Sequence, residues 1–252
     1  MNRSILSVAV FLGILFSACA SAATPSPTTA PPPSPTSTPI PTATKPPPTD
    51  TPISTATATE IPIFWDDFDK EFLPGWSWIR ENDALWSLTS QPGFLRIVLD
   101  SAGRSRNLLV RSVASENFQI TTHVLFTPTT NFQGAGITVY QDDAIMVNLI
   151  RAYCNTANVC VGNGVYFDRI ENGSFTGSNF GTDTNLKDEA YLRIDKEGSV
   201  FTAYYSDDGA NWQAIGQHEL FMTDPKVGLT HGGSHIVGAI ALFDYFGLQE
   251  MP

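Results

Sequence analysis

Residues 134–150 read GAGITVYQDDAIMVNLI, two alternating runs separated by Asp142 and Asp143. In each run the side chains change character at every second position, which is the period of a β-strand with two different faces. Adjacent aspartates favour a turn between such strands. The segment therefore predicts strands over Gly136–Tyr140 and Ile145–Ile150, joined by a tight turn.

The same two-residue period recurs from Ile61 onward, and β-branched and aromatic residues are enriched in the alternating segments. No segment shows a helical period beyond about one turn. Further strands are expected at 94–99, 119–126, 161–167, 191–195, 200–205 and 239–243, and turns at Asn163-Gly164, Asn172-Gly173, Glu197-Gly198 and Asp208-Gly209. Many short strands at this spacing predict an all-β, two-sheet antiparallel sandwich or jelly roll over residues 61–250.

Residues 1–19 have the organisation of a lipoprotein signal peptide. Arg3 supplies a positive charge, residues 5–16 are apolar, and Phe16-Ser17-Ala18-Cys19 resembles a lipobox. The apolar run is too short to span a bilayer, which needs about 20 residues. No later segment is a transmembrane candidate. Lipidation of Cys19 would anchor the protein to a membrane, outside the cytoplasm. Cleavage as an ordinary Ala-x-Ala signal, which would release a free secreted protein, is the alternative.

Residues 20–60 are rich in proline and threonine. Residues 24–59 hold 12 of the 18 prolines and 12 threonines, with Lys45 and Asp50 as the charged residues. Such a segment cannot bury enough apolar surface to offset its ordering entropy. It therefore predicts a disordered, extended stalk of up to about 100 Å, rather than a mere low-complexity tail.

The charge and the cysteines of the remaining domain indicate which partners it can bind and in which compartment it is located. Residues 60–252 contain 12 Lys and Arg against 24 Asp and Glu, which argues against nucleic acid or an anionic membrane surface as a partner. A neutral ligand or a divalent cation is compatible with this charge. Cys154 and Cys160 form a close pair in an exported domain, which favours a disulfide over two free thiols.

Five short segments together carry a family resemblance. They are DDF at 66–68, WSWIREN at 76–82, GFLRI at 93–97, GAGITVYQDD at 134–143 and FDYFG at 243–247. In this order they resemble the concanavalin A-like C-terminal domain of family 43 glycoside hydrolases, the β-xylosidases and their relatives. The resemblance covers residues 62–250 and implies a jelly-roll fold. In those hydrolases a separate five-bladed propeller carries the catalytic carboxylates. We expect no propeller in this chain, so hydrolase activity is not implied.

The sequence also lacks the pattern of catalytic jelly rolls, which place carboxylates at alternate strand positions as E-x-D-x-x-E. Carbohydrate binding without catalysis needs indole or phenol rings for the apolar faces of sugars, with polar groups beside them. The alternative for each tryptophan is a place in the core, and for His231 a place in a polar Gly-rich loop. The candidate carbohydrate-binding residues are Trp76, Trp78, Arg80, Glu81, Tyr140, Gln141 and His231.

Asp67 and Asp244 are the candidate ligands of a structural calcium ion. Asp67 lies near the first strand and Asp244 near the last, and the first and last strands of such sandwiches often pair. Calcium takes six to eight oxygen ligands, so backbone carbonyls and water would supply most of them. The alternative is that both carboxylates are outward-facing residues at strand ends. A separate segment, Tyr205–Trp212, predicts a hairpin turn at Asp208-Gly209, with the Asp208 side chain capping backbone amides.

These observations predict a lipid-anchored monomer on the cell surface or the periplasmic face, which displays one β-sandwich on a stalk. The most direct interpretation is noncatalytic binding of a polysaccharide or other glycan. The alternative is a structural or protein-interaction lipoprotein without a glycan site, and a hydrolase or lyase is a third possibility. Glycan binding predicts an exposed Trp or Tyr within reach of Arg80 or Glu81, whereas a scaffold predicts that these aromatic rings are buried.

Overall fold

The computed structural model describes residues 64–100, 106–157, 161–183, 188–232 and 238–251. The described part is all-β, as the alternating sequence predicts, and its helical element is one 3-10 turn, η1 (Asp83–Leu85). No helix within the described ranges is long and apolar enough to span a bilayer. Segments 1–19 and 20–60, with the predicted signal peptide, Cys19 and the stalk, lie outside these ranges.

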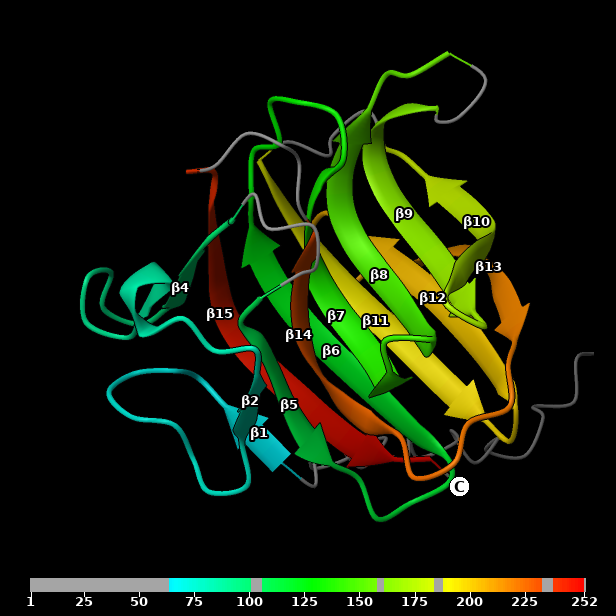
Figure 1. Ribbon diagram of the computed structural model, residues 1–252, viewed down its shortest axis with the longest axis horizontal. Helices are drawn as coiled ribbons and strands as arrows, with labels where there is room; N and C mark the ends of the chain where they lie inside the picture. The colour runs from blue at the N-terminus through cyan, green and yellow to red at the C-terminus, as the bar shows by residue number, and fades with distance from the viewer. Residues whose placement is uncertain (1–63, 101–105, 158–160, 184–187, 233–237, 252) are drawn as a thin grey trace, which may run out of the picture. The chain divides into compact units, whose positions relative to one another are not determined.

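Two antiparallel sheets form a sandwich (Figure 1). The seven-stranded sheet has the order β10-β9-β8-β7-β14-β5-β2. The eight-stranded sheet has the order β13-β12-β11-β6-β15-β4-β3, and β1 also pairs with β15. The strands are β1 (Phe64–Asp66), β2 (Ser77–Ile79), β3 (Trp86–Ser87), β4 (Leu95–Val98), β5 (Leu108–Ser112), β6 (Phe118–Leu125), β7 (Gln133–Asp142), β8 (Ile145–Cys154), β9 (Gly162–Glu171), β10 (Ser174–Gly181), β11 (Glu189–Glu197), β12 (Val200–Ser206), β13 (Gln213–Glu219), β14 (Lys226–Gly232) and β15 (Ile240–Glu250).

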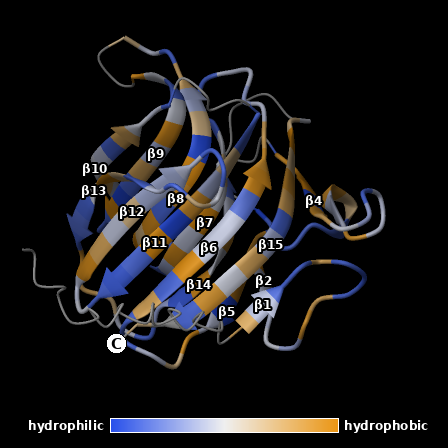
Figure 2. Ribbon diagram, turned by 180° about the vertical axis from the view of Figure 1, so that it is seen from behind, coloured by the Kyte–Doolittle hydropathy of each residue, from blue (hydrophilic) through white to orange (hydrophobic). Residues whose placement is uncertain are grey.

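The core lies between the sheets and is built from every second residue of the long strands. In β6, Phe118, Ile120, Thr122 and Val124 are fully buried, while Gln119 and Thr121 between them are half-buried. From behind, Figure 2 shows the same alternation as bands of hydrophobic and hydrophilic colour along β6, β11 and β15. Period-two patterning thus fixes which side chains enter the core.

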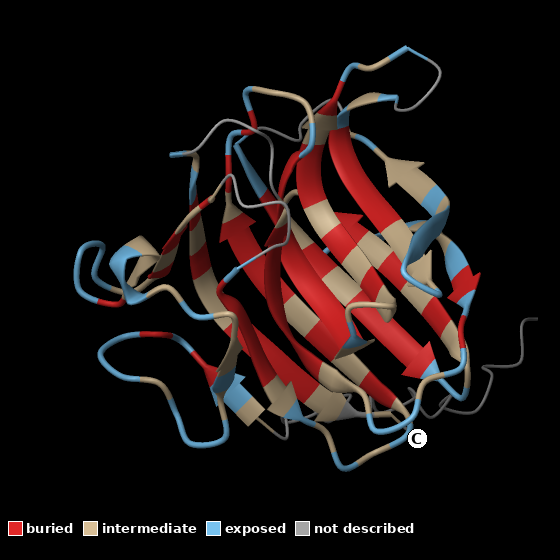
Figure 3. Cartoon of the chain, viewed as in Figure 1, coloured by how far each residue is buried: buried red, intermediate tan, exposed pale blue. Residues whose placement is uncertain are grey.

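The outer face of the seven-stranded sheet is unusual because it is also largely buried. Residues of β5, β7, β8 and β9 that point away from the main core form two separate apolar clusters. Figure 3 shows β7, β8 and β9 mostly as buried, although no strand of the described residues lies in front of them. One cluster contains Leu108, Val110 and Tyr140, and the other contains Ala152, Cys154 and Tyr166.

Most expected turns are present, and one is not. Asn172 and Gly173 have φ angles of 53° and 72° and join β9 to β10 as a tight hairpin. Asp208 accepts hydrogen bonds from the amides of Ala210 and Asn211, as the capping prediction required. The expected turn at Asn163-Gly164 is wrong, because both residues lie inside β9 and pair with β8. Position 164 requires a glycine for lack of space rather than for a turn, because a Cβ there would lie 2.6 Å from the carbonyl oxygen of Gly181.

Candidate functional site

A row of polar side chains crosses the outer face of the seven-stranded sheet. Thr138 on β7 pairs with Asn148 on β8, Asn148 pairs with Asp168 on β9, and Asp168 pairs with Ser178 on β10. Paired residues on neighbouring strands share a face, and their Cβ atoms lie about 5 Å apart. Four strands spaced about 4.8 Å apart give the row a length of roughly 14 Å. The row becomes more open from β7 to β10, since Thr138 is fully buried and Ser178 is exposed.

Asn148 carries an unsatisfied amide oxygen in the middle of this row. The residue as a whole is half-buried, but its Oδ1 atom is buried and has no hydrogen-bond partner. Leaving a buried polar group without a partner costs about 1–3 kcal/mol. Native proteins keep few such groups, and those that persist often mark a place for water or a ligand.

Asp168 lies beside Asn148 and has an unusual acidity. Ser178 Oγ donates a hydrogen bond to Asp168 Oδ1 at 2.6 Å. Desolvation by burial nevertheless dominates and raises the pKa of Asp168 to about 6, because the single hydrogen bond from Ser178 offsets only part of it. The side chain is therefore an acceptor at neutral pH and becomes a donor as well in mildly acidic solution.

Apolar and aromatic side chains flank the polar row on both sides. One flank contains Tyr140 and Met146, which pair with each other across β7 and β8. The other flank contains Ile150, Tyr166 and Phe180, and the rings of the last two meet edge to face with centroids 5.0 Å apart. Polar groups between apolar walls form the kind of surface that binds the mixed polar and apolar faces of a sugar.

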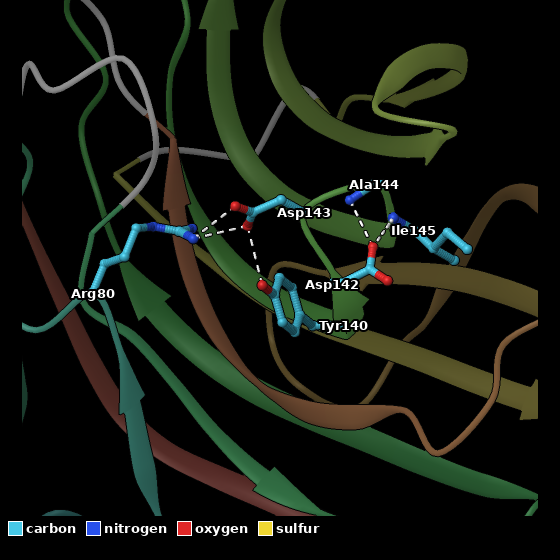
Figure 4. Close-up of polar contacts among 6 residues, drawn as sticks. All are labelled: Arg80, Tyr140, Asp142, Asp143, Ala144 and Ile145. Atoms are coloured by element: carbon cyan, nitrogen blue, oxygen red, sulfur yellow. Dashed lines mark hydrogen bonds and ion pairs between the residues drawn. The ribbon is translucent and has the colours of Figure 1, made fainter.

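Arg80, Tyr140 and Asp143 form a hydrogen-bonded cluster at one end of the face (Figure 4). Arg80 Nη1 donates to both carboxylate oxygens of Asp143 at 2.8 and 2.9 Å. The Tyr140 hydroxyl donates to Asp143 Oδ1 at 3.0 Å. Asp143 lies in the β7–β8 turn, which Asp142 closes by accepting the amides of Ala144 and Ile145. Two of the sequence candidates, Arg80 and Tyr140, therefore meet through a residue that the sequence had indicated only as a turn.

The tryptophan candidates are packed against the core. The Trp76 indole N–H donates to Asp66 Oδ2 at 2.8 Å, and its ring meets Phe246 edge-on at 5.0 Å. Trp78 is half-buried and stacks at a tilt on Trp86, with centroids 5.1 Å apart. Both positions correspond to the core alternative, and neither ring is the freely exposed platform that the glycan interpretation expected.

Glu81 and Gln141 contact other parts of the domain. Glu81 Oε1 accepts the indole N–H of Trp86 at 3.1 Å. Gln141 Oε1 accepts the amide of Thr223 at 2.8 Å, which ties the end of β7 to the loop before β14. Neither side chain is part of the polar row.

His231 lies inside the sandwich rather than on its surface. It sits on β14 opposite Ala135, and only 1% of its surface is exposed. Burial lowers the pKa of His231 to about 4, so the imidazole is neutral at pH 7. A ligand on either outer face cannot contact this side chain.

The two calcium candidates lie near paired strands but have different surroundings. β1 pairs with β15, so the first and last strands are neighbours as expected. Asp67 is exposed, whereas Asp244 Oδ2 lies 3.0 Å from His123 Nδ1. No group of three or more His, Cys, Asp or Glu placed to hold a metal occurs within the described ranges. A calcium ion at these aspartates would take most of its ligands from backbone oxygens and water.

The outer face of the eight-stranded sheet carries stacked rings beside polar register partners of its own, namely Gln119, Asp195, Thr202 and Gln217. His123 and Tyr191 stack with centroids 4.0 Å apart, and Trp65 and Tyr245 stack at 4.2 Å. Since stacked rings cover one another's faces, they offer less free ring surface to a sugar.

Cys154, on the seven-stranded sheet, is disulfide-bonded, and its expected partner Cys160 lies outside the described residues.

Asn148, Asp168 and Ser178 were not among the sequence candidates, and their distances from the turns do not identify them. Counted outward from the two turns, Asn148 would face Val139 and Ser178 would face Phe167. A register shift in each hairpin instead places Asn148 opposite Thr138 and Ser178 opposite Asp168. The polar row therefore depends on two irregularities that the sequence pattern does not indicate.

The order of the strands in two packed antiparallel sheets is that of a concanavalin A-like β-sandwich. Residues 65–246 match the beta xylosidase C-terminal concanavalin A-like domain. The chain belongs to this family, which confirms the resemblance carried by its five segments. No curated protein matches the chain.

Solved structures share the fold at low identity. GH43B of a Bacteroides ovatus xyloglucan PUL is 22% identical with a TM-score of 0.65, over 77% of this chain and 40% of that one. The xylan β-1,4-xylosidase of Bacillus halodurans is 21% identical with a TM-score of 0.63, over 74% and 39%. This chain thus spans about two fifths of the length of these proteins. The VIP36 exoplasmic/lumenal domain, in a form bound to Ca²⁺ and Man3GlcNAc, is 15% identical with a TM-score of 0.51, over 71% and 85%.

Proposed function

We propose that this protein is a noncatalytic carbohydrate-binding module, and that it binds glycans on the outer face of the seven-stranded sheet. The observation that carries the proposal is the polar row from Thr138 to Ser178, which lies between two apolar clusters and contains the unsatisfied Asn148 Oδ1. A sugar presents hydroxyls at its rim and C–H groups on its faces, which matches this arrangement of polar and apolar groups.

The comparisons support the proposal at the level of the domain. The matched family is the C-terminal domain of β-xylosidases rather than their catalytic part, which favours a role without catalysis. A lectin-like neighbour, VIP36, is described with a bound oligosaccharide. Xylan, arabinan and cell-envelope glycans are the candidate ligands. The proposed protein is a monomer that is anchored outside the cytoplasm through a lipid on Cys19 and extended on the stalk at 20–60.

A glycan array tests the proposal. The full chain is applied in calcium and then in a chelator, because Asp67 and Asp244 are proposed to hold a structural calcium ion. We expect binding to at least one plant or microbial polysaccharide, and loss of that binding in Asn148→Ala. Gln119→Ala is the matched control, since Gln119 is an amide on the outer face of the other sheet and should bind like the wild type.

The scaffold alternative predicts the opposite result. The half-buried state of Trp76 and Trp78 is the observation that favours it. Absence of binding to every glycan in both conditions would reject the carbohydrate-binding proposal and favour a structural or protein-interaction role. Binding that survives in Asn148→Ala would keep the function but move the site away from the polar row.

A further inference from the structure

We propose that Asn148 and Asp168 form an amide–carboxylate pair that binds two adjacent hydroxyls of a neutral sugar and disfavours acidic sugars. The inference rests on the proposed carbohydrate-binding function and specifies the ligand class of that same site. It assigns a binding role to two residues on neighbouring strands, at the centre of the polar row.

The geometry of the pair suits two hydroxyls on adjacent carbons. Asn148 and Asp168 are register partners on β8 and β9, so their side chains project from the same face about 5 Å apart. The amide offers both a donor and an acceptor, and the ionised carboxylate offers acceptors. A hydroxyl can donate and accept at once, so two neighbouring hydroxyls can bridge the two side chains.

Hydrogen bonds within the protein do not use all of the donor and acceptor groups of Asn148 and Asp168. Asn148 Oδ1 has no partner, and Ser178 is the partner of the Asp168 carboxylate within the described residues. Thr138, at the buried end of the row, is satisfied by donating to the carbonyl oxygen of Val147 at 3.2 Å. The unsatisfied atom of the row, Asn148 Oδ1, therefore lies at its centre beside the Asp168 carboxylate, where the row is reached from the more open β10 side.

The charges around Asp168 explain the discrimination against acidic sugars. On its own strand the titratable group on the same face is Tyr166, while β8 contributes Asn148 and β10 contributes Ser178. Arg169 alternates to the other face and binds Thr176 and the Glu219 carbonyl.

Other basic side chains are engaged or placed elsewhere. His218 on β13 contacts the carbonyl oxygen of Phe167. Arg80 and Lys226 lie at the Tyr140 end of the face, where Arg80 is paired with Asp143. A uronic acid carboxylate placed at the Asn148–Asp168 pair would therefore meet a carboxylate without a compensating cation, and like charges repel strongly where solvent is reduced.

The repulsion should be switchable by pH. Asp168 becomes protonated near pH 6, which is well above the ordinary range of an aspartate. Below that pH the carboxyl no longer repels an acidic sugar and can donate a hydrogen bond to it. The preference for neutral glycans should accordingly weaken in mildly acidic solution.

The test compares wild type and Asp168→Asn on an array of neutral and uronic-acid-containing plant and microbial glycans, at pH 7.5 and pH 5.0. We expect wild type at pH 7.5 to favour neutral glycans over their uronic-acid-substituted counterparts by about tenfold or more. The preference should shrink several-fold at pH 5.0, and in Asp168→Asn it should be small at both pH values. Glu71→Gln is the matched control, because it removes an exposed carboxylate that is not part of the polar row. This variant should behave like wild type.

The outcomes separate the two proposals. Binding of glycans with a preference that Asp168→Asn does not change, or with no preference at pH 7.5, overturns the inference while the carbohydrate-binding function stands. Absence of binding to every glycan by wild type at both pH values overturns the function and the inference together.

Discussion

Replacing Asp168 by Asn should stabilise the protein in neutral and basic solution. Folding raises the pKa of Asp168 from 3.8 to about 6, because burial desolvates the carboxylate. The folded state therefore holds this proton more tightly than the unfolded chain does. At 1.4 kcal/mol for each pH unit of difference, the ionised carboxylate opposes folding by about 2–3 kcal/mol above pH 6, after allowance for its partial exposure. The penalty is absent below the unfolded-state pKa of 3.8.

Urea unfolding followed by tryptophan fluorescence, from pH 4 to pH 8, measures this effect. The free energy of unfolding of Asp168→Asn should exceed that of wild type by about 2–3 kcal/mol at pH 8, and the two should converge near pH 4. Asn keeps the shape of the side chain and can still accept the hydrogen bond of Ser178. Glu71→Gln should show no such dependence. A difference that is independent of pH, or a variant that is less stable than wild type at pH 8, would refute the reasoning.

Three further predictions concern residues that stabilise the sandwich. Trp76→Phe removes the indole donor to the buried Asp66 carboxylate and should lower the free energy of unfolding by about 1–3 kcal/mol in urea titrations at pH 7. Asp208→Ala should lower the melting temperature at pH 7, because four hydrogen bonds to its carboxylate hold the pKa of Asp208 below its ordinary value of 3.8. That loss should fade as the pH falls below 3.8, because the unfolded chain takes up the proton there while the folded carboxylate still resists it. His231 is buried with a pKa of about 4, so stability should be complete above pH 6.5 and fall as the pH drops toward 4. His231→Gln should flatten that slope in the same urea measurements.

Period-two patterning predicted the strands that have one face in the core, such as β8 and β12. It did not predict β10, whose sequence SFTGSNFG is mostly small and polar because this edge strand is largely exposed. It also did not predict β14, which reads KVGLTHG and is buried on both faces. Alternation disappears in both cases because the two faces of the strand meet similar surroundings.

The candidate site could be predicted only in part for a related reason. Hairpin turns bring β7 beside β8 and β9 beside β10, but a register shift in each hairpin decides that Thr138 pairs with Asn148 and Asp168 with Ser178. The pairing of Asn148 with Asp168 depends on the longer connection between β8 and β9, and a long loop does not set the register. The tryptophans were misleading because the sequence does not distinguish a tryptophan in the core from one on a binding face. The residues that pack against the ring in the folded protein decide which it is.

A crystal structure of the protein with the glycan that binds most tightly on the array tests the central claim most directly. The account predicts a sugar ring over the seven-stranded sheet, with hydroxyls within hydrogen-bond distance of Asn148 and Asp168. A sugar bound to the outer face of the eight-stranded sheet, near Trp65 and Tyr191, would contradict it.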